Sequence, residues 1–382
     1  MRTCKSLGCK VLLLTSLDLK EEPWPRESLD DIFYIPEAGD KWSRSDLIKG
    51  VSYMARTVKF DKIVALDDFD LERAALLREH IRIPGMGDTR TRYFRDKLAM
   101  RTQALEAGIP VPPFVHVLNH ARIHAFVQQT PAPWVLKPRS QASATGIKKV
   151  RSASELWHLV EALGDQQSFY LLEQFIPGNI YHVDSVVFDE AVVFERAHQY
   201  TAPPLEVAHE GGIFATMTVD YGSEDEQALL EMNKRVIKAM GLKAGVSHTE
   251  FIRDENEAFY FLETSARVGG AHIAEMLEAS SGINLWAEWA KIETLPAGAP
   301  YHVPVARQDH AGVIISLARQ EKPDTSSFND PEIVWRMSKK HHIGLIVQSA
   351  ERARVKELLD DYALRIHQDH HASHPPADNP TY

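Results

Sequence analysis

The sequence predicts an α/β protein made of three units. In the first ninety residues, short apolar strands alternate with helical segments, a pattern typical of a small parallel sheet. From Phe114 to about Glu293, strands and helices are mixed, and a polar turn joins two strands as a hairpin. The last unit, about residues 300–367, has two apolar strands and a helix.

Length and composition are those of a folded protein with two or three domains: 382 residues, 44% hydrophobic and 25% charged. No run approaches the roughly 20 apolar residues that span a bilayer, and MRTCKSLGCKVLLLTSLDLKEE lacks the features of a signal peptide. The net charge of −10, without a basic stripe, argues against nucleic acid as a partner. Cys4 and Cys9 are the only cysteines and are expected to be free thiols. We therefore expect a cytoplasmic protein that binds neither nucleic acid nor membranes.

The N-terminal unit is expected to carry two acids at a sheet edge. Its predicted elements are strands at Lys10–Thr15, Asp31–Ile35 and Lys62–Leu66 and helices at Ser45–Thr57 and Leu71–His80. Asp67 and Asp68 follow the third strand, at the carboxyl end where open α/β sheets bind ligands. Acids at this position also serve as helix N-caps, and we favour the cap for both.

A polar turn at residues 84–88 separates this unit from the next. A helix is expected at Arg92–Ala107, because Gly108 is a typical C-cap and the Pro-rich strand entry IPVPPF follows it. The predicted elements of the last unit are strands at Ala311–Leu317 and Ile343–Gln348 and a helix at Glu351–Ile366. The tail HQDHHASHPPADNPTY is expected to be disordered.

The stretch WVLKPRSQASATGIKKV, residues 134–150, places one lysine at the mouth of a hydroxyl-rich loop between two strands. A strand that ends in Lys137 holds an ammonium in place, and the loop offers N–H groups and the hydroxyls of Ser140, Ser143 and Thr145 to anionic oxygens. An ordinary hairpin with a polar tip is the alternative for this stretch taken alone.

A second stretch, LLEQFIPGNIYHVDSVVF at residues 171–188, has an extended edge and then a Pro-Gly turn. Such a linker can present backbone N–H and C=O groups to the rim of a purine. In the strand after the turn, period-two alternation puts His182, Asp184 and Val186 on one face. This face can line a cleft, or it can be the wet side of an ordinary sheet.

The third stretch is a hairpin, with strands Val246–Arg253 and Ala258–Thr264. Glu250 and Glu263 project from paired strands, and two such carboxylates suit Mg²⁺. Arg267 follows and can hold a carboxylate or a phosphoryl group by its planar fork. The next two glycines, Gly269-Gly270, let the backbone pass close to a ligand. A structural ion pair between Glu263 and Arg267 is the alternative, but it leaves Glu250 and the two glycines unexplained.

The chain carries, in this order, a lysine with a flexible loop, a purine linker, two paired acids and an arginine. This order resembles that of the ATP-grasp superfamily, in its carboxylate–amine ligase branch. The chain is similar to bacterial amino-acid ligases and biotin carboxylase-like proteins over about residues 1–300. The resemblance implies an α/β ATP-grasp fold with ATP held between two α+β subdomains. The implied divisions are an N-terminal parallel-sheet domain at 1–92, subdomains at 93–170 and 171–297, a small C-terminal α/β unit at 298–367 and a disordered tail at 368–382.

The resemblance also assigns nucleotide contacts. Lys97, after Asp96 at a helix, resembles the first nucleotide-binding lysine, and Lys137 the second, ahead of a flexible loop at 139–147. Glu173-Gln174-Phe175-Ile176 resembles the adenine hinge, with Glu173 at the amino edge of the purine. His182 resembles a histidine beside the nucleotide. The implied ATP-binding set is Lys97, Lys137, Ser140, Ser143, Glu173, Gln174, Phe175, Ile176, His182 and Asp184.

Metal and substrate residues follow from the same resemblance. Glu250 and Glu263 resemble the metal ligands, with Ser265 where most members have an asparagine. Arg267 resembles the arginine that stabilises the acyl-phosphate step and, with Lys137, is the expected catalytic residue. Independently of the resemblance, the loop His198–Phe214 is expected to face the substrate because it follows the hinge strands, and a plain surface histidine is the favoured alternative for His209. The implied substrate set is His209, Glu210, Arg267, Gly269 and Gly270.

Two further departures from the family pattern concern the nucleotide. Ile180 precedes Tyr181 where many relatives have a ribose-binding glutamate, which leaves that role to Asp184 or His182. Gln141 stands where a loop glycine is usual, which is expected to stiffen the loop.

The activity implied is that of an ATP-dependent ligase that forms an amide or peptide bond through an acyl phosphate and releases ADP and phosphate. The cofactors implied are ATP and Mg²⁺, with Mn²⁺ as a substitute, and the partners are a small carboxylic acid and an amine or amino acid. A homodimer is the assembly considered. The alternatives are a biotin-carboxylase-like carboxylating ligase and an inactive ATP-binding regulatory module.

Overall fold

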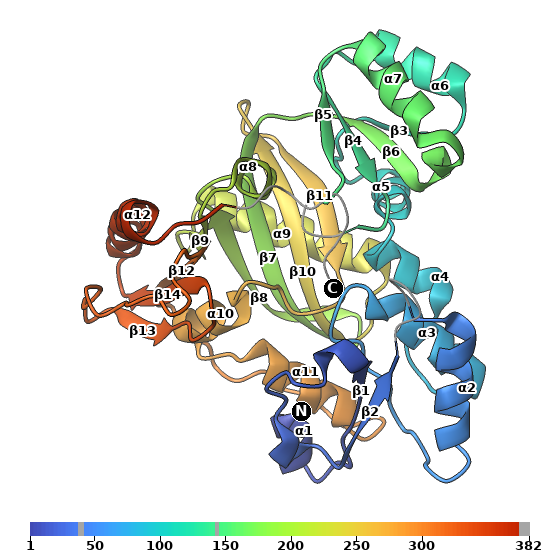
Figure 1. Ribbon diagram of the computed structural model, residues 1–382, viewed down its shortest axis with the longest axis vertical. Coiled ribbons are helices and arrows are strands. Elements are labelled where there is room, and N and C mark those ends of the chain that lie inside the picture. The colour runs from blue at the N-terminus through green and yellow to red at the C-terminus, as the bar shows by residue number, and fades with distance from the viewer. Residues whose placement is uncertain (37–41, 142–144, 374–382) are drawn as a thin grey trace.

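The computed structural model describes residues 1–36, 42–141 and 145–373, with residues 209 and 210 described by their backbone alone. Its strands form three sheets of two, eight and four strands. Figure 1 shows the four-stranded sheet and its helices as a separate lobe beside the large central sheet. The predicted α/β class is confirmed: the N-terminal sheet is parallel and the other two are antiparallel.

The N-terminal unit contains the elements α1 (Arg2–Ser6), β1 (Leu12–Ser16), β2 (Asp31–Ile35), α2 (Arg44–Met54) and α3 (Asp70–Ile81). β1 and β2 pair in parallel, as the alternation of strands and helices predicts. Leu47 of α2 and Leu77 of α3 are buried in a common apolar cluster, which fixes the two helices against the small sheet.

The predicted third strand at Lys62–Leu66 is not formed. This segment joins none of the sheets in the described part of the chain. The carbonyl of Ile63 instead accepts a hydrogen bond from Nε of Arg78 on α3, at 2.8 Å. The prediction was wrong because the Arg78 guanidinium bonds to the Ile63 carbonyl, which would otherwise need a partner on a neighbouring strand.

The predicted continuous helix Arg92–Ala107 is interrupted. The segment consists of α4 (Asp88–Thr91), a 3-10 turn (Arg92–Phe94) and α5 (Lys97–Glu106). Asp96 is the N-cap of α5 and accepts the Leu98 N–H at 2.9 Å. An aspartate in this position starts a new helix, because its carboxylate takes a donor that has no partner inside the helix. The interruption places Lys97 at the first position of α5.

The separate lobe contains β3 (Phe114–His116), α6 (His120–Gln129), β4 (Trp134–Pro138), β5 (Lys148–Val150), α7 (Ala153–Leu163) and β6 (Tyr170–Gln174). Its strand order is β3-β6-β4-β5. Trp134 and Leu136 on β4 are buried against Ile123 and Leu156 of the two helices. β6 belongs to this sheet, which therefore extends to Gln174 along the chain.

The large sheet has the strand order β11-β10-β7-β8-β9-β12-β14-β13. Its first five strands along the chain, with the helices between and after them, are β7 (Gly178–Phe188), β8 (Ala191–Tyr200), α8 (Pro204–Glu210), β9 (Phe214–Thr218), α9 (Glu224–Met240), β10 (Gly245–Asp254), β11 (Phe259–Ser265), α10 (Ile273–Ser281) and α11 (Leu285–Thr294). The predicted hairpin of β10 and β11 is confirmed.

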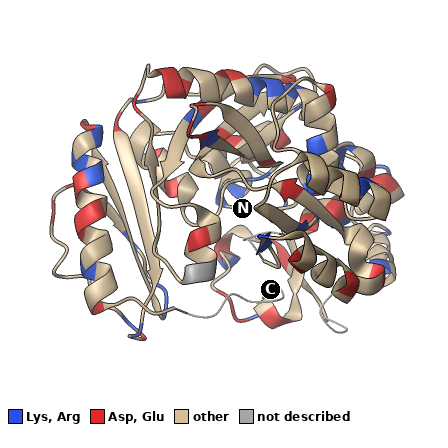
Figure 2. Cartoon of the chain, turned by 90° about the horizontal axis from the view of Figure 1, so that it is seen from above, with Lys and Arg blue, Asp and Glu red and all other residues tan. Residues whose placement is uncertain are grey.

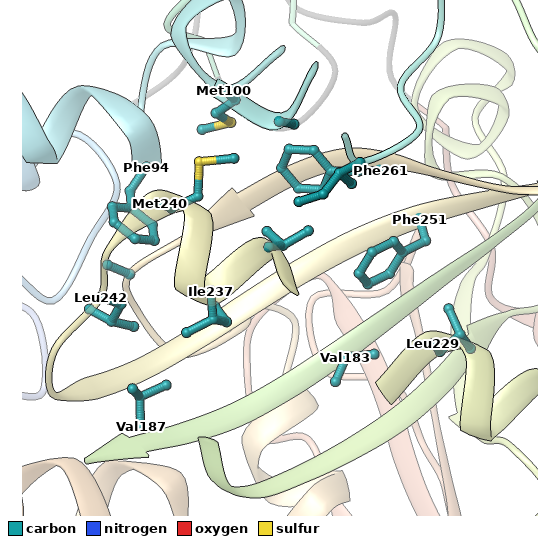
Figure 3. Packing of buried hydrophobic residues seen from close by; sticks show 14 of the residues in the cluster. Phe94, Met100, Val183, Val187, Leu229, Ile237, Met240, Leu242, Phe251 and Phe261 are labelled. Carbon is teal, nitrogen blue, oxygen red and sulfur yellow. The ribbon is translucent and has the colours of Figure 1, made fainter. Parts of the chain in front are cut away.

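Helix α9 covers one face of this sheet. Ser223 caps its N-terminus, and Gly241, with φ of 75°, ends it. Leu229 and Ile237 on α9 pack in one cluster with Phe251 of β10, and Figure 3 shows these side chains between helix and strands. Each buried side chain of this size contributes about 1.5–3 kcal/mol relative to exposure. The large sheet is therefore held by a buried apolar contact with α9.

The C-terminal segment adds strands to the large sheet. Its elements are β12 (His310–Leu317), β13 (Ile333–Arg336), β14 (His342–Ser349) and α12 (Arg352–Asp369). β12 pairs with β9, so the predicted small C-terminal unit continues the central sheet. The predicted tail also begins later, because α12 runs to Asp369 and His371 bridges to Ala318. Residues 374–382 of that tail lie outside the described residues.

Charges are distributed over the whole surface. Figure 2 shows acidic and basic residues interspersed along the helices. Cys4 and Cys9 are free, as predicted. Within the residues described, no helix combines the length and apolarity needed to cross a membrane.

Candidate active site

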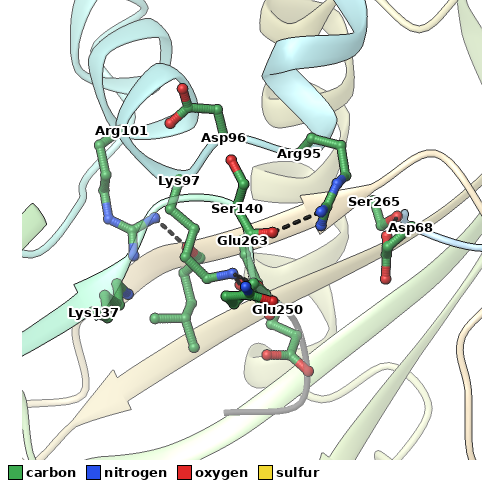
Figure 4. Close-up of polar contacts among 12 residues, drawn as sticks. Asp68, Arg95, Asp96, Lys97, Arg101, Lys137, Ser140, Glu250, Glu263 and Ser265 are labelled. Carbon is green, nitrogen blue, oxygen red and sulfur yellow. Dashed lines mark hydrogen bonds and ion pairs between the residues drawn. The ribbon is translucent and has the colours of Figure 1, made fainter. Parts of the chain in front are cut away.

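A cavity of about 690 Å³ lies between the four-stranded lobe and the large sheet. Its walls include Lys137 of β4, Glu173 of β6, Glu250 of β10 and Glu263 of β11. Asp68 of the N-terminal unit also lines it. The volume lies in the range of small-molecule sites, about 300–1,000 Å³. Figure 4 shows the charged side chains that converge here from α5 and the strands.

Lys137 is buried in an ionic group at the back of the cavity. Its Nζ contacts Oε1 of Glu173, while Oε2 of Glu173 accepts from Nη2 of Arg101 at 3.0 Å. Burial lowers the pKa of Lys137 to about 8, although the Glu173 carboxylate opposes this change. Arg101, fully buried on α5, was missed by the sequence analysis; its only signal was its spacing of four residues from Lys97, which places both cations on the buried face of the helix with Met100 and Ala104.

Lys97 contacts the predicted metal site directly. Its Nζ lies 2.7 Å from Oε2 of Glu263 and donates to the carbonyl oxygen of Gln141 at 2.7 Å. Burial by itself would raise the pKa of Glu263, but the ammonium of Lys97 lowers it to about 2. The carboxylate is therefore ionised at neutral pH. The alternative ion pair between Glu263 and Arg267 is not formed.

The predicted phosphate loop is tied to the start of α5. Nε of Arg139 donates to Oδ1 of Asp96 at 3.0 Å, and Arg95 donates to the Ser140 carbonyl at 2.6 Å. Gln141 and Thr145 line the cavity. Ser143 lies outside the described residues. The described part of the loop thus borders the cavity beside Lys97.

The predicted hinge residues Gln174, Phe175 and Ile176 line the cavity. The N–H groups of Gln174 and Phe175 donate to the carbonyls of Pro113 and Pro133, at 2.9 and 3.0 Å. In the hydrogen bonds described for this segment, the Ile176 N–H has no protein acceptor. Ile176 is therefore the hinge residue whose N–H a purine edge can use. Lys149 stacks its ammonium over the Phe175 ring, 3.5 Å from the centroid.

Glu250 and Glu263 lie directly opposite each other in the antiparallel pair of β10 and β11. Oε1 of Glu250 accepts the hydroxyl of Tyr200 at 2.9 Å and lies 3.4 Å from Nε2 of His248. Directly opposite residues have Cβ atoms about 4.5–5.5 Å apart, so both carboxylates reach one cation. Two carboxylates beside lysines that suit phosphate are the ligand set that Mg²⁺ prefers. The residues present fit the predicted metal.

His182 and Asp184 do not line the cavity. Both are fully buried, and Asp184 bridges three imidazoles: its oxygens lie 2.7 Å from Nδ1 of His182, 3.2 Å from Nδ1 of His198 and 2.8 Å from Nδ1 of His248. Burial lowers the pKa of His182 to about 3. Burial also acts against charge on His248, but Asp184 raises its pKa to about 10. His182 and Asp184 therefore support His248 from behind the wall and do not face a nucleotide.

Asp68 brings the N-terminal unit into the site. Its Oδ2 accepts Nε–H of Arg267 at 2.8 Å and also contacts Nη2, and its Oδ1 accepts the Ser265 hydroxyl. The prediction that Asp68 caps a helix was wrong. Its two carboxylate oxygens are instead bonded to the Arg267 guanidinium and the Ser265 hydroxyl, so neither is left for the N–H groups at the start of α3. Asp67 does act locally, accepting the Phe69 N–H at 2.8 Å. Ser265, the predicted third metal ligand, points its hydroxyl at Asp68.

Gly269 and Gly270 lie in different surroundings. A Cβ on Gly269 would stand 2.9 Å from Nδ1 of His248 and 3.0 Å from Oδ1 of Asp184, so only glycine fits. Gly270 lines the cavity and has open space around it. In the predicted substrate loop, residues 203–208 at α8 line the cavity, whereas the side chains of His209 and Glu210 lie outside the described residues.

Comparisons with known proteins agree on one fold. The family profile described as "ATP-grasp domain" matches residues 102–273. The L-arginine-specific L-amino acid ligase of Bacillus subtilis is 28% identical over 252 residues, which are 63% of this chain and 60% of that protein. The D-alanine–D-alanine ligase of Coprothermobacter proteolyticus is 27% identical over 191 residues, 46% of this chain and 59% of that one. The chain thus spans less than two thirds of these relatives.

Solved structures are similar over nearly the whole chain. The L-amino acid ligase from Bacillus licheniformis aligns with a TM-score of 0.73 and 18% identity, covering 94% of this chain and 93% of that one. Biotin carboxylase from Campylobacter jejuni aligns with a TM-score of 0.70 and 18% identity, covering 96% and 92%. These similarities show the shared fold.

Proposed function

We propose that this chain, which contains an ATP-grasp domain and has the ATP-grasp fold, is an ATP-dependent carboxylate–amine ligase. The observation that supports this most is the convergence of Lys97, Lys137 and Arg267 with the opposed acids Glu250 and Glu263 on one cavity. Cations and metal-binding carboxylates at one end of a cavity suit transfer of a terminal phosphoryl group.

The reaction has two steps. An oxygen of the substrate carboxylate attacks the γ-phosphorus of ATP, and the bond from that phosphorus to the β–γ bridging oxygen breaks, giving an acyl phosphate and ADP. The amine nitrogen then attacks the acyl carbon, inorganic phosphate leaves, and the amine proton passes to solvent. The product is an amide, or a peptide when the amine is an amino acid.

The nucleotide is proposed to lie with its purine at the Ile176 N–H and its phosphates toward Lys97 and Lys137. Lys137 is buried away from water in an ionic group with Glu173 and Arg101, and fixed charges in such a water-excluded site stabilise developing charge strongly. Negative charge that develops on the phosphoryl oxygens would meet both ammonium groups without rearrangement of the protein.

Glu250 and Glu263 are proposed to hold Mg²⁺, with Mn²⁺ as a substitute. The metal neutralises phosphate charge when bound. Tyr200 and His248 hold Glu250 through its Oε1 oxygen, so this ligand is oriented before the metal arrives. Ser265 is a weaker candidate ligand, since its hydroxyl proton is directed at Asp68.

Arg267 is proposed to bind the substrate carboxylate and then the acyl phosphate through its free N–H groups. The acid and the amine are proposed to be small molecules, with an amino acid among the candidates because the named relatives are amino-acid ligases. Gly270 and residues 203–208 form the part of the wall available for substrate selection. A cytoplasmic location and a homodimer complete the proposal.

The deciding experiment is a screen of carboxylic acids and amines for ATP-dependent product, with nucleotides separated and amides identified by mass spectrometry. ADP and inorganic phosphate are expected in equal amounts with the amide. Hydroxylamine in place of the amine should trap the activated acid as a hydroxamate, because an acyl phosphate reacts with any good nucleophile. AMP as the stoichiometric product would replace this proposal with an acyl-adenylate mechanism.

The same screen separates the two alternatives. Turnover that requires bicarbonate as the acid would identify a carboxylating ligase, and binding of ATP without turnover under any combination would identify a regulatory module. Both results would overturn the ligase proposal.

A further inference from the structure

We infer that Asp68 is a positioning residue for Arg267, so that the N-terminal unit completes the catalytic site. This inference rests on the proposed function, because the role of Arg267 in the acid-activating step comes from it. The structure adds a residue from outside the ATP-grasp domain match, 199 positions away from Arg267 along the chain.

The contact is buried and uses the whole carboxylate. Asp68 is buried, and its two oxygens have different partners: Oδ2 accepts Nε–H and Nη2–H of Arg267, while Oδ1 accepts the Ser265 hydroxyl. Ser265 is the last residue of β11, the strand that carries Glu263, and Arg267 follows two residues later. One side chain therefore fixes the path of the chain from β11 into the residues that face the cavity.

The remaining donors of Arg267 can be counted. A guanidinium has five N–H groups. Nε–H and one Nη2–H point at Asp68, and Nη1 donates to the carbonyl of Val268 at 2.7 Å. In the contacts described for this side chain, one N–H on each Nη atom is left. Because Arg267 lines the cavity, these two donors are available to a carboxylate or phosphoryl group.

Asp68 also keeps Arg267 away from the metal site. Asp67 and Glu263 also act electrostatically on Arg267, and of these two acids Glu263 lines the cavity. Without Asp68, the guanidinium would have Glu263 as a competing counter-ion, and pairing there would take a carboxylate from the metal. Asp68 thus keeps Arg267 available to the substrate and leaves Glu263 available to the metal.

A surface ion pair between domains would not have these features. Exposed pairs contribute about 0–1 kcal/mol and have no fixed geometry. Here both side chains are largely buried, at 19% exposure for Arg267 and 10% for Asp68, and a hydroxyl adds a third point of attachment. The side chain of the neighbouring Asp67 hydrogen-bonds to the nearby Phe69 N–H and acts on Arg267 through space without contacting it, so Asp67 is a control for the loss of a nearby charge without the loss of a contact.

The kinetic test compares Asp68→Asn with Asp67→Asn in the full chain. A misplaced catalytic group lowers turnover by about 100-fold, so Asp68→Asn should lower kcat to that extent while the Kd for ATP, measured by calorimetry, stays within about twofold. Asp67→Asn keeps an oxygen acceptor for the Phe69 N–H and should match the parent. In an Arg267→Lys background, Asp68→Asn should have little further effect, because the planar fork it positions is already gone.

A second measurement does not depend on activity. Phenylglyoxal modifies accessible arginines, and the modified peptides can be counted by mass spectrometry. Arg267 should be modified slowly in the parent and in Asp67→Asn, where Asp68 holds its Nε and Nη2 atoms, and several times faster in Asp68→Asn, while far-UV circular dichroism confirms that each variant is folded.

The outcomes are distinct. Equal Arg267 modification in Asp68→Asn and the parent, or an unchanged kcat, would overturn the inference. A parent enzyme without turnover on any acid and amine would reject the proposed function and, with it, the catalytic role of the pair. The labelling result would then still report whether Asp68 holds Arg267.

Discussion

Nζ of Lys97 and Oε2 of Glu263 lie 2.7 Å apart, joining the first residue of α5 to β11 across the cavity. One is the proposed phosphate ligand and the other the proposed metal ligand. Phosphate and Mg²⁺ would give each a new partner of opposite charge. We therefore expect nucleotide and metal to bind together more tightly than either alone, and the predictions below address the groups around this pair.

Lys137→Ala should remove an ammonium from the phosphate end of the cavity. The expected loss in transition-state stabilisation, from kcat/KM, is about 2–4 kcal/mol. Because Lys137 is also a buried partner of Glu173, activity should be expressed per folded molecule. Lys148→Ala, on an exposed neighbour in β5, is the control. A variant with the parent's kcat/KM would remove Lys137 from the mechanism.

Glu263→Gln keeps the size of the side chain but removes one charge from the proposed metal site. Activity should fall by about 100-fold, and added Mg²⁺ should restore it only in part. The control is Glu255→Gln in the exposed hairpin turn of the same strand pair. If the variant melts early while the folded fraction keeps normal activity, Glu263 serves only as the ion-pair partner of Lys97.

Tyr200→Phe tests the support of the second acid. Loss of the hydroxyl that donates to Glu250 at 2.9 Å should raise the Mg²⁺ concentration needed for half-maximal activity by about tenfold. Activity at saturating Mg²⁺ should change little. Tyr301→Phe removes an equivalent tyrosine–glutamate bond, to Glu288 at 2.7 Å, away from the cavity. An equal Mg²⁺ requirement in both variants would contradict the proposed role of Tyr200.

Asp96 should make stability depend on pH. Burial raises its pKa, but the Arg139 guanidinium outweighs burial and holds the pKa below the ordinary value of 3.8. A lowered carboxylate pKa stabilises the fold above the ordinary value, and this contribution is lost as pH falls through the folded value. Asp96→Asn keeps the cap but not the charge, so it should cost about 1.5–3 kcal/mol at neutral pH.

Urea unfolding of the parent and Asp96→Asn at several pH values provides the measurement. The difference between them should shrink as pH falls below 3.8. Asp61→Asn, which affects an exposed pair with Lys59 at 3.3 Å, should show little difference at any pH. A gap between parent and Asp96→Asn that is independent of pH would mean that the charge on Asp96 contributes nothing.

Local patterns in the sequence predicted the elements that hold the site. Period-two alternation and the polar turn at 254–257 predicted the β10–β11 hairpin, and they placed Glu250 and Glu263 on paired strands because side chains alternate strictly along a strand. The strand that ends in Lys137 was predicted for the same reason. The resemblance to the ATP-grasp superfamily is confirmed by the ATP-grasp domain match over residues 102–273 and by the shared fold.

Tertiary structure decided which charged groups pair. Nothing local distinguishes Asp68 from Asp67, yet one meets Arg267 and the other bonds two residues away, because pairing depends on where distant segments pack. For the same reason, Glu263 pairs with Lys97 and not with Arg267, and Asp184 turns away from the cavity to bridge three imidazoles. Sequence periodicity fixes the face of a strand on which a charge lies, whereas burial and the nearest opposite charge fix its partner, and both of these arise only when the units come together.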